Sequence, residues 1–145
     1  MSFEDDIRRF SRKTDARVNL AVKKIVFDVA TRLVLRSPVG DASYWRSPAP
    51  PGYVGGRFRA NWQFAINNYD TTTSDNVDAG GGKTLVRIGR EVPNDASGKV
   101  HFITNSLAYS KALEEGRSRQ APNGMVRLTV LEFEPIIKQV IAELT

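Results

Sequence analysis

The chain has 145 residues, of which 41% are hydrophobic, and this predicts a single domain over residues 1–145 with a core of its own. The absence of cysteine excludes a disulfide framework and thiolate chemistry, and no segment approaches the ~20 apolar residues of a membrane-spanning helix. The acidic start from Ser2 to Asp6 lacks the basic residues and the apolar run of a signal peptide, so we expect synthesis in the cytoplasm and no membrane partner.

The net charge of +5 is unevenly distributed along the chain. Residues 1–60 hold 12 Lys and Arg against 6 Asp and Glu, whereas residues 61–145 hold 9 against 10. A basic region of this kind can contact nucleic acid or an acidic protein surface, and it is equally what a solvated helix face contains. Both alternatives stay open.

Residues 3–36 are predicted to form one long amphipathic helix. Ser2 is the candidate N-cap, and acidic residues follow it in the first turn, where the helix dipole favours negative charge. The second half of the helix, from Ile25 to Leu35, is apolar nearly all round, which suits either a core position or a subunit interface. Pro38 ends the helix. The apolar residues recur at steps of three and four: Phe3, Ile7, Phe10, Thr14, Val18, Ala21, Ile25, Val29 and Leu33.

Residues 37–56 are predicted to be a long loop, because proline and glycine recur throughout them. A loop of this length in a compact domain is usually functional or disordered. Its aromatic and arginine side chains suit contact with a partner protein, packing over the domain's own surface, or stacking on single-stranded nucleic acid. These side chains are Tyr44, Trp45, Arg46 and Tyr53.

Three strands are predicted after this loop. Residues 57–67 alternate apolar and polar side chains, which is typical of a strand with one buried face, and Arg57 and Arg59 then leave the polar face together. Residues 84–89 and 99–104 are predicted to be the other two strands, and the glycine-rich residues 70–82 to lie in the hairpin loop before residue 84.

Two features could suggest chemistry, and neither supports it. Gly80-Gly81-Gly82-Lys83-Thr84 resembles part of a phosphate-binding loop, but Val77 stands where that pattern requires glycine, and a strand is predicted where it requires a helix. His101, the only histidine, has no cysteine or second histidine to complete a zinc site, and no serine or cysteine lies in a recognisable catalytic motif. We therefore expect no cofactor, no metal and no enzymatic activity.

The last third of the chain is predicted to contain two helices. A short helix covers residues 107–115, with Ser106 as candidate N-cap and Gly116 as the left-handed residue that ends it. A basic connector and a turn at residues 121–124 then lead into a C-terminal helix over residues 125–144, which Pro135 should kink or divide. The β-branched residues at 126–130 leave a strand there as the alternative. Glu132 and Glu134 lie two residues apart and share no helix face, which argues against a paired acid–base role.

Together these elements predict an α+β fold. The long N-terminal helix and the C-terminal helix pack on a small antiparallel sheet of three or more strands, with a short helix and long loops. Open sheet edges and surplus apolar helix surface are liabilities for a monomer, and they become interfaces in an assembly. The residues alone therefore predict an α+β domain that oligomerises.

Two regions of the chain also resemble a known family. Tyr-Ser-Lys-Ala-Leu-Glu-Glu-Gly at 109–116 and Gln-Ala-Pro-Asn-Gly-Met-Val-Arg at 120–127 resemble the Tyr-Ala-x-x-Leu-Glu-x-Gly and Ala-Pro-x-Gly-Met segments of the neck or tail-completion proteins of long-tailed bacteriophages. Arg-Ser-Pro-Val-Gly-Asp at 36–41 and Gly-Arg-Phe-Arg-Ala-Asn-Trp at 56–62 resemble that family's Ser-Pro-Val-x-x-Gly-x-x-Arg-x-x-Trp segment, with a longer connection between the two parts. The resemblance covers roughly residues 20–140.

The resemblance implies a structural virion protein, made in the host cytoplasm and located in the neck or tail of the virion. It implies a homomeric ring, a hexamer by family analogy, that completes the tail and joins it to the head. The implied partners are further copies of the chain, the head-side connector or adaptor protein, and the tail terminator or tail tube protein. DNA would pass through the lumen without specific binding.

The expected docking segments are the loops 40–56, 70–82 and 117–123, with Tyr44, Trp45, Arg46 and Tyr53 as loop contacts. Glu114 is a candidate partner for an arginine of the adjacent subunit. The positions expected to act in assembly are Arg57, Arg59, Trp62, Tyr109, Glu114, Gly116, Arg117, Pro122 and Met125. Arg57 and Arg59 are expected to contact another subunit or a neighbouring ring, and the family-matched Tyr109, Glu114, Gly116, Pro122 and Met125 to shape the helix–loop–helix. The alternative function is a small basic nucleic-acid-binding protein, whose DNA affinity would fall steeply with salt. An enzyme would require a catalytic spacing that the sequence lacks.

Overall fold

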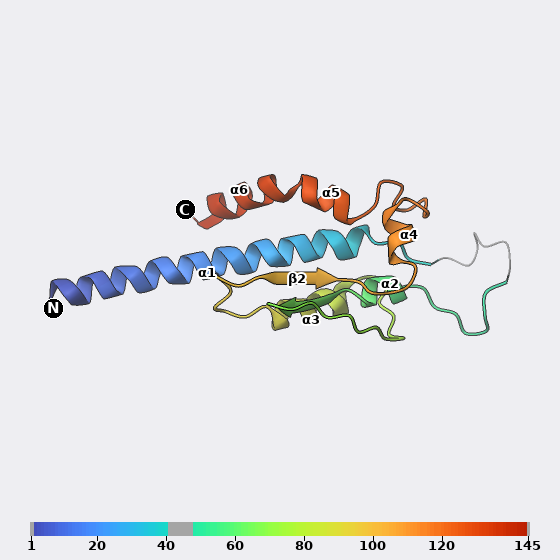
Figure 1. Ribbon diagram of the computed structural model, residues 1–145, viewed down its shortest axis with the longest axis horizontal. Coiled ribbons are helices and arrows are strands. Elements are labelled where there is room, and N and C mark those ends of the chain that lie inside the picture. The colour runs from blue at the N-terminus through green and yellow to red at the C-terminus, as the bar shows by residue number, and fades with distance from the viewer. Residues whose placement is uncertain (1, 41–47, 145) are drawn as a thin grey trace.

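The computed structural model describes residues 2–40 and 48–144. Its elements, in chain order, are α1 (Phe3–Arg36), α2 (Arg57–Ala60), β1 (Gln63–Ile66), α3 (Gly82–Glu91), β2 (His101–Thr104), α4 (Ser110–Glu114), α5 (Val126–Leu131) and α6 (Phe133–Leu144). The long helix α1 is the spine of the molecule: α5 and α6 lie along one side of it, and the sheet with α2 and α3 lies along the other (Figure 1). The predicted α+β class is confirmed.

Helix α1 begins and ends where the sequence predicts. Ser2 accepts a hydrogen bond from the Asp5 amide, and the Asp5 side chain accepts one from the Ser2 amide, which completes a capping box. Ser37 has an extended backbone before Pro38 and ends the helix. The second half of α1 buries Val26, Ala30, Leu33 and Val34 in the core.

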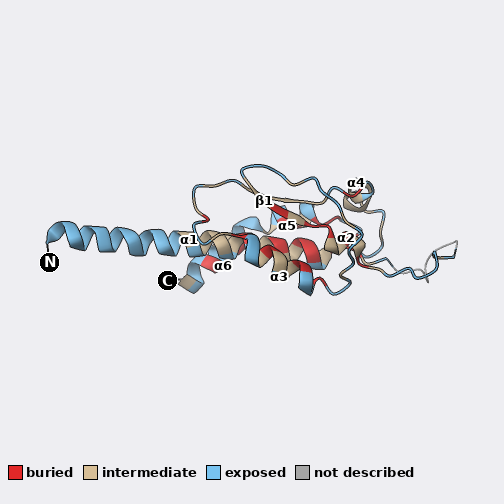
Figure 2. Cartoon of the chain, turned by 90° about the horizontal axis from the view of Figure 1, so that it is seen from below, coloured by how far each residue is buried: buried red, intermediate tan, exposed pale blue. Residues whose placement is uncertain are grey.

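The first half of α1 projects from the body of the molecule. Every residue from 2 to 18 is exposed, and Figure 2 shows this part of the helix in a continuous pale blue. We call residues 3–18 the arm. The arm stays helical although its apolar side chains contact no core.

The C-terminal helix is divided in two, as Pro135 predicted. Helix α5 ends at Leu131 and α6 starts at Phe133, so Pro135 falls in the first turn of α6, where no intrahelical N–H bond is lost. Both helices contact α1, and they bury Met125, Thr129, Ile136 and Val140. The helix in α5 rules out the strand that β-branched residues 126–130 left open.

The sheet in the described residues has two strands, which corrects the prediction of three or more. Strands β1 and β2 are antiparallel, with Gln63 opposite Thr104 and Ile66 opposite His101. The third predicted strand, residues 84–89, is instead part of α3. Thr84, Ile88 and Val92 are buried at intervals of four, which places them on one helix face.

The predicted strand over residues 57–67 is half wrong. Residues Arg57–Ala60 form the short helix α2, and only Gln63–Ile66 is a strand. Phe58 and Trp62 are both buried, and a spacing of four fits one face of a helical turn as well as alternate positions of a strand. Gly56 enters α2 with a φ of 109°, a left-handed conformation that glycine adopts without strain.

The core lies where α1, α2, α3, the sheet and the start of α5 meet. Figure 2 shows the buried residues concentrated on the second half of α1 and on α3 and β1. In the described residues, none of the helices is long and apolar enough to span a membrane.

Candidate functional site

The region of family resemblance folds into a tightly tied junction between α4 and α5. Glu114, the last residue of α4, accepts hydrogen bonds from the amides of Met125 (2.8 Å), Val126 (2.9 Å) and Arg127 (2.8 Å). These amides open α5 and would otherwise lack partners. Burial raises the pKa of the Glu114 carboxyl, but the three amide hydrogen bonds outweigh it and hold that pKa below its ordinary value.

Two glycines allow the chain to close at this junction. Gly116 has a φ of 92°, and a Cβ there would lie 2.4 Å from the carbonyl oxygen of Pro122. Gly124 has a φ of 81°, and a Cβ there would lie 2.5 Å from the carbonyl oxygen of Glu114. The predicted left-handed Gly116 is confirmed. The predicted N-cap is wrong: Tyr109, not Ser106, precedes α4, and its side chain accepts no cap hydrogen bond.

The second region of resemblance converges on the end of α1. Arg59 donates to the carbonyl oxygens of Leu35 (2.9 Å), Ser37 (2.8 Å) and Ala79 (2.8 Å). Trp62 donates its indole N–H to the Ser37 hydroxyl at 2.7 Å, and that hydroxyl donates to the Leu33 carbonyl. Arg59 thus satisfies carbonyls at the C-terminus of α1, a position that also favours positive charge.

Arg57 reaches a different segment. Its guanidinium donates to the Ser74 carbonyl at 3.0 Å and lies 3.5 Å from the Asp75 carboxylate. The side chain of the fully buried Asn61 binds the backbone of the same Ser74: its Nδ2 donates to the Ser74 carbonyl oxygen, and its Oδ1 accepts from the Ser74 amide. The polar excursion at 70–78 is therefore fastened to α2 by residues on one side of that helix.

The glycine-rich stretch at 80–84 gives one correction. A helix, α3, does follow it, so the predicted strand was a wrong reason for excluding a phosphate-binding loop. The absent glycine at Val77 remains, and the structure supplies a stronger reason. The Asp78 carboxylate accepts hydrogen bonds from the amides of Gly81 (3.1 Å) and Thr84 (2.7 Å), so it already occupies the N-terminus of α3.

A cleft opens at the end of the molecule between the loop after α1 and the α4 junction. It has a volume of about 960 Å³ and is bordered by aromatic and basic side chains. Burial raises the pKa of the Tyr109 hydroxyl, and the nearby charge of Arg57 offsets only part of this. The Tyr109 ring packs on Phe58, with centroids 5.9 Å apart. The residues of the cleft that carry the argument are Tyr53, Arg57, Tyr109, Arg117 and Arg119.

The predicted assembly residues thus divide into two groups. Tyr53, Arg57, Tyr109 and Arg117 line the cleft together. Glu114, Gly116 and the exposed Pro122 shape the α4–α5 junction, and Arg59 binds carbonyls at the end of α1. Trp62 and Met125 lie in the core, with 3% and 1% of their surfaces exposed. Because Trp62 and Met125 are buried, they can act in assembly only through the shape that they give to the domain. Tyr44, Trp45 and Arg46 lie outside the described residues.

The two carboxylate oxygens of Glu114 accept three hydrogen bonds from its own chain. The contact with an arginine of an adjacent subunit stays a prediction. The role of Glu114 in this geometry is to cap α5.

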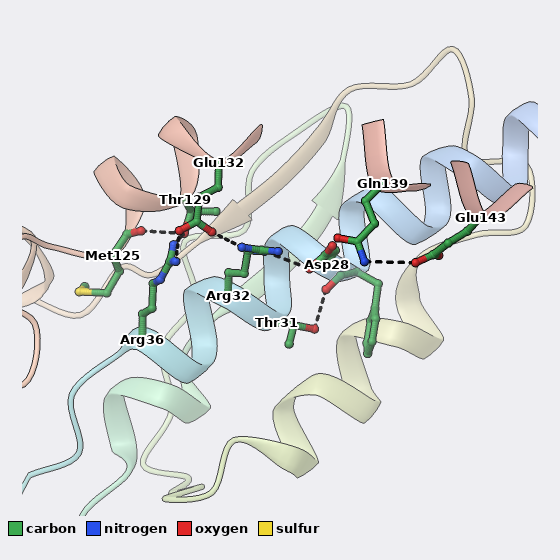
Figure 3. A network of polar contacts seen from close by, with 10 residues as sticks. Asp28, Thr31, Arg32, Arg36, Met125, Thr129, Glu132, Gln139 and Glu143 are labelled. Carbon is green, nitrogen blue, oxygen red and sulfur yellow. Dashed lines mark hydrogen bonds and ion pairs between the residues drawn. The ribbon is translucent and has the colours of Figure 1, made fainter. Parts of the chain in front are cut away.

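The structure reveals one polar cluster that the sequence did not indicate. Glu132, in the break between α5 and α6, binds both Arg32 and Arg36 of α1, and Arg36 also donates to Thr129 at 3.1 Å (Figure 3). The hydrogen bond from Arg36, and then that from Arg32, lower the pKa of Glu132 against the opposing effect of burial. The only advance signal was the spacing of Arg32 and Arg36, four apart on one helix face.

The described part of the chain includes the only histidine, which the sequence analysis weighed for zinc binding and catalysis. His101 lies on β2 as predicted, with Nε2 2.8 Å from the Ala96 carbonyl oxygen. No group of three or more His, Asp or Glu residues there could hold a metal ion.

Comparison of the chain with models of protein families, with curated proteins and with solved structures finds no match.

Proposed function

We propose that this chain is a structural virion protein of a long-tailed phage, which forms a homomeric ring in the neck, completes the tail and joins it to the head connector. The ring has six copies by analogy with the family that residues 109–127 and 36–62 resemble. Its neighbours are the head-side adaptor and the tail terminator or tube protein, and DNA crosses the lumen without specific binding. The protein catalyses no reaction.

The observation that carries the proposal is a second apolar face on α5 and α6. The inner face of these helices packs on α1. The outer face presents a row of exposed apolar side chains at helical spacing, and the most exposed of them, Val130, retains 66% of its surface. The row consists of Val126, Val130, Phe133 and Ile141. Helices that expose apolar side chains outside the face they bury are typical of a subunit interface.

The geometry of such a face is compatible with ring closure. In a ring, a surface on one subunit meets a different surface on the next, and the same rotation relates each subunit to its neighbour until the ring closes. The outer face of α5 and α6 is one such surface. The unpaired edges of β1 and β2, in the described part of the chain, offer backbone groups for the complementary one.

The cleft at the α4 junction supports docking above or below the ring. It combines tyrosines with arginines, a composition that is common at the anchor points of protein interfaces. The residues resembling the family segments shape this cleft through Glu114, Gly116 and Gly124. A loop of the adaptor or terminator protein is the occupant that this function requires.

The alternative is a small nucleic-acid-binding protein, and the same cleft favours it, since arginines beside aromatic rings also bind single strands. The arm adds exposed basic residues: Arg8, Arg9, Arg12, Lys13 and Arg17. This function predicts tight DNA binding at low salt that is lost at high salt.

Light scattering of the full chain, at low and high salt and with and without DNA, separates the two. We expect a ring-sized species with a central opening in electron micrographs, indifferent to DNA. Val130→Glu should abolish that species, whereas Val86→Glu, at a residue of α3 that is 54% exposed and away from both proposed ring surfaces, should not. A wild-type chain that never exceeds a dimer and binds DNA in a salt-dependent way would overturn the ring and favour the alternative.

A further inference from the structure

The arm of α1 presents an apolar stripe that the body of the molecule leaves uncovered. Phe3 is 79% exposed, Phe10 is 73% exposed and Ile7 is 50% exposed, all on a helix that continues without a break into the core. Each phenylalanine can bury about 150–250 Å² when it packs fully, so leaving two of them in water forgoes a large hydrophobic stabilisation. The stripe therefore requires an occupant from outside.

The spacing of the stripe specifies the shape of that occupant. Phe3, Ile7, Phe10 and Thr14 follow one another at steps of four, three and four, which is the seam of a two-stranded coiled coil. The seam covers three turns, about 18 Å of helix at 1.5 Å per residue. A second helix of similar length fits it.

We propose that the occupant is a second copy of the arm, packed antiparallel about a two-fold axis. In the register that places Ile7 of one arm on Phe10 of the other, the two-fold repeats this contact, and each Phe3 meets the other copy's Thr14. The large side chains then occupy the middle of the seam.

Charge complementarity selects this arrangement. Asp6 and Lys13 flank the seam on the same side, seven residues apart. In the antiparallel register each Asp6 lies beside the other copy's Lys13, so the symmetry yields two opposite-charge contacts per pair. A parallel pair would set Asp6 beside Ser11 and Lys13 beside Val18, with neither contact formed.

The same charges argue against a lipid surface as the occupant. A basic amphipathic helix can lie on an anionic membrane. Here Glu4, Asp5 and Asp6 lie at the end of the stripe, beside Phe3 and Ile7, and would be repelled by anionic headgroups.

The proposed pair is independent of the ring. A two-fold contact closes on itself and cannot propagate around a ring, and it uses the arm, whereas the ring uses the outer face of α5 and α6. The seam is short, so the pair belongs with small, transient interfaces rather than obligate dimers.

Sedimentation equilibrium of the full chain tests the pair, in wild type and in the Val130→Glu background that removes the ring surface. We expect a monomer–dimer equilibrium in that background, which Phe10→Glu abolishes and Val86→Glu, on the exposed side of α3, leaves unchanged. Far-UV circular dichroism confirms that each variant keeps its helix content. A monomer at every concentration up to about 1 mM, where about half of the chains would be paired if the Kd were 1 mM, overturns the proposal.

A charge-reversal cycle tests the antiparallel register. Asp6→Lys and Lys13→Asp should each weaken the pair about tenfold or more at low salt, because two opposite-charge contacts become two like-charge contacts. The double variant should restore the affinity to within about threefold of the parent, since both pairs are re-formed in reverse. Single variants with no effect, or a double variant weaker than either, would exclude this register.

Cross-linking distinguishes the orientations directly, because the chain has no cysteine of its own. A mixture of Phe3→Cys and Thr14→Cys chains should form a disulfide-linked heterodimer, whereas Phe3→Cys alone should not link to itself. Linking of Phe3→Cys to itself would establish a parallel pair. Vesicles of anionic phospholipid provide the last comparison: a chain that is monomeric in solution but binds them through Phe10 would assign the arm to a membrane surface and overturn pairing.

Discussion

Glu114 shows how one carboxylate can organise a junction. It ends α4 and, through three amides, fixes the start of α5, so the chain between them is held at both ends. Glu114→Ala should lower the free energy of unfolding by about 1–3 kcal/mol, because it removes the cap and leaves amides without partners. The matched control is Glu115→Ala, at the exposed neighbouring residue, which should change stability by less than about 0.5 kcal/mol. Urea unfolding of both variants provides the comparison, and equal midpoints would contradict the capping role.

The lowered pKa of Glu114 gives this residue a signature in pH. The pKa of this carboxyl is lower in the folded state than in the unfolded state. Such a group stabilises the protein at pH values above its pKa in the unfolded state, and the stabilisation is lost as the pH falls through its pKa in the folded state. The stability difference between wild type and Glu114→Ala should therefore be full near pH 7 and shrink below about pH 4.3, the ordinary glutamate value. Repeating the urea titrations between pH 7 and pH 3 measures it. A difference that stays constant over this range would show that the carboxylate charge is irrelevant.

Gly124 separates the cost of backbone conformation from the cost of crowding. Gly124→Ala should destabilise the protein by more than Gly98→Ala, and by about 1–3 kcal/mol in total. Both glycines have a positive φ, 81° and 74°, but a Cβ at Gly98 meets nothing within 4 Å, whereas at Gly124 it meets the Glu114 carbonyl at 2.5 Å. Thermal unfolding of the two variants compares them. Equal losses would mean that the junction relaxes without cost.

At the scale of the element, the end of α1 depends on the shape of one guanidinium. Arg59→Lys should destabilise the fold by about 1–2 kcal/mol, because an ammonium cannot span the three carbonyls that the planar fork reaches. The control is Arg90→Lys, which makes the same substitution on the exposed face of α3. It should leave the stability of the fold unchanged. Chemical denaturation measures both, and a neutral Arg59→Lys would show that its charge alone suffices.

The elements also show which parts of the fold the sequence can predict. Helix α1 and the division of the C-terminal helix, which falls at Glu132 just before Pro135, follow from local signals: a cap, a long apolar repeat and proline. The residues of α3 were predicted to be a strand because four apolar and β-branched residues in a short run fit either period. The burial of Thr84, Ile88 and Val92 on α1 and the sheet decided for helix, and that is a tertiary contact.

The candidate site follows the same division. The turn glycines and the position of the α4–α5 junction could be predicted, because left-handed glycine and Ala-Pro-Asn-Gly are local signals. The cleft could not, because Tyr53, Arg57 and Arg117 meet only after α2 and α4 have packed at the end of α1. The tie from Glu132 to Arg32 and Arg36 joins residues about 100 positions apart, which no local pattern encodes.

At the scale of the whole molecule, the chain consists of a packed body and a projecting arm, and the two should differ in dynamics. Amides in residues 3–18 should exchange hydrogen faster than those in residues 26–34, because helix without tertiary packing opens locally at little cost. If the arms pair, raising the protein concentration should lower the hydrogen-exchange rates of amides in the arm and leave those of amides in the body unchanged. Uniform protection along α1 at low concentration would contradict an unsupported arm.

The continuity of α1 has a mechanical consequence. The helix is about 51 Å long at 1.5 Å per residue, and it runs unbroken from the capping box at Ser2 to the carbonyls gripped by Arg59. A helix of this kind transmits twist about its axis as a shaft does. Once a neighbouring molecule holds the arm in its helical form, a torque applied there would pass along α1 toward Ser37 and Arg59 at the other end.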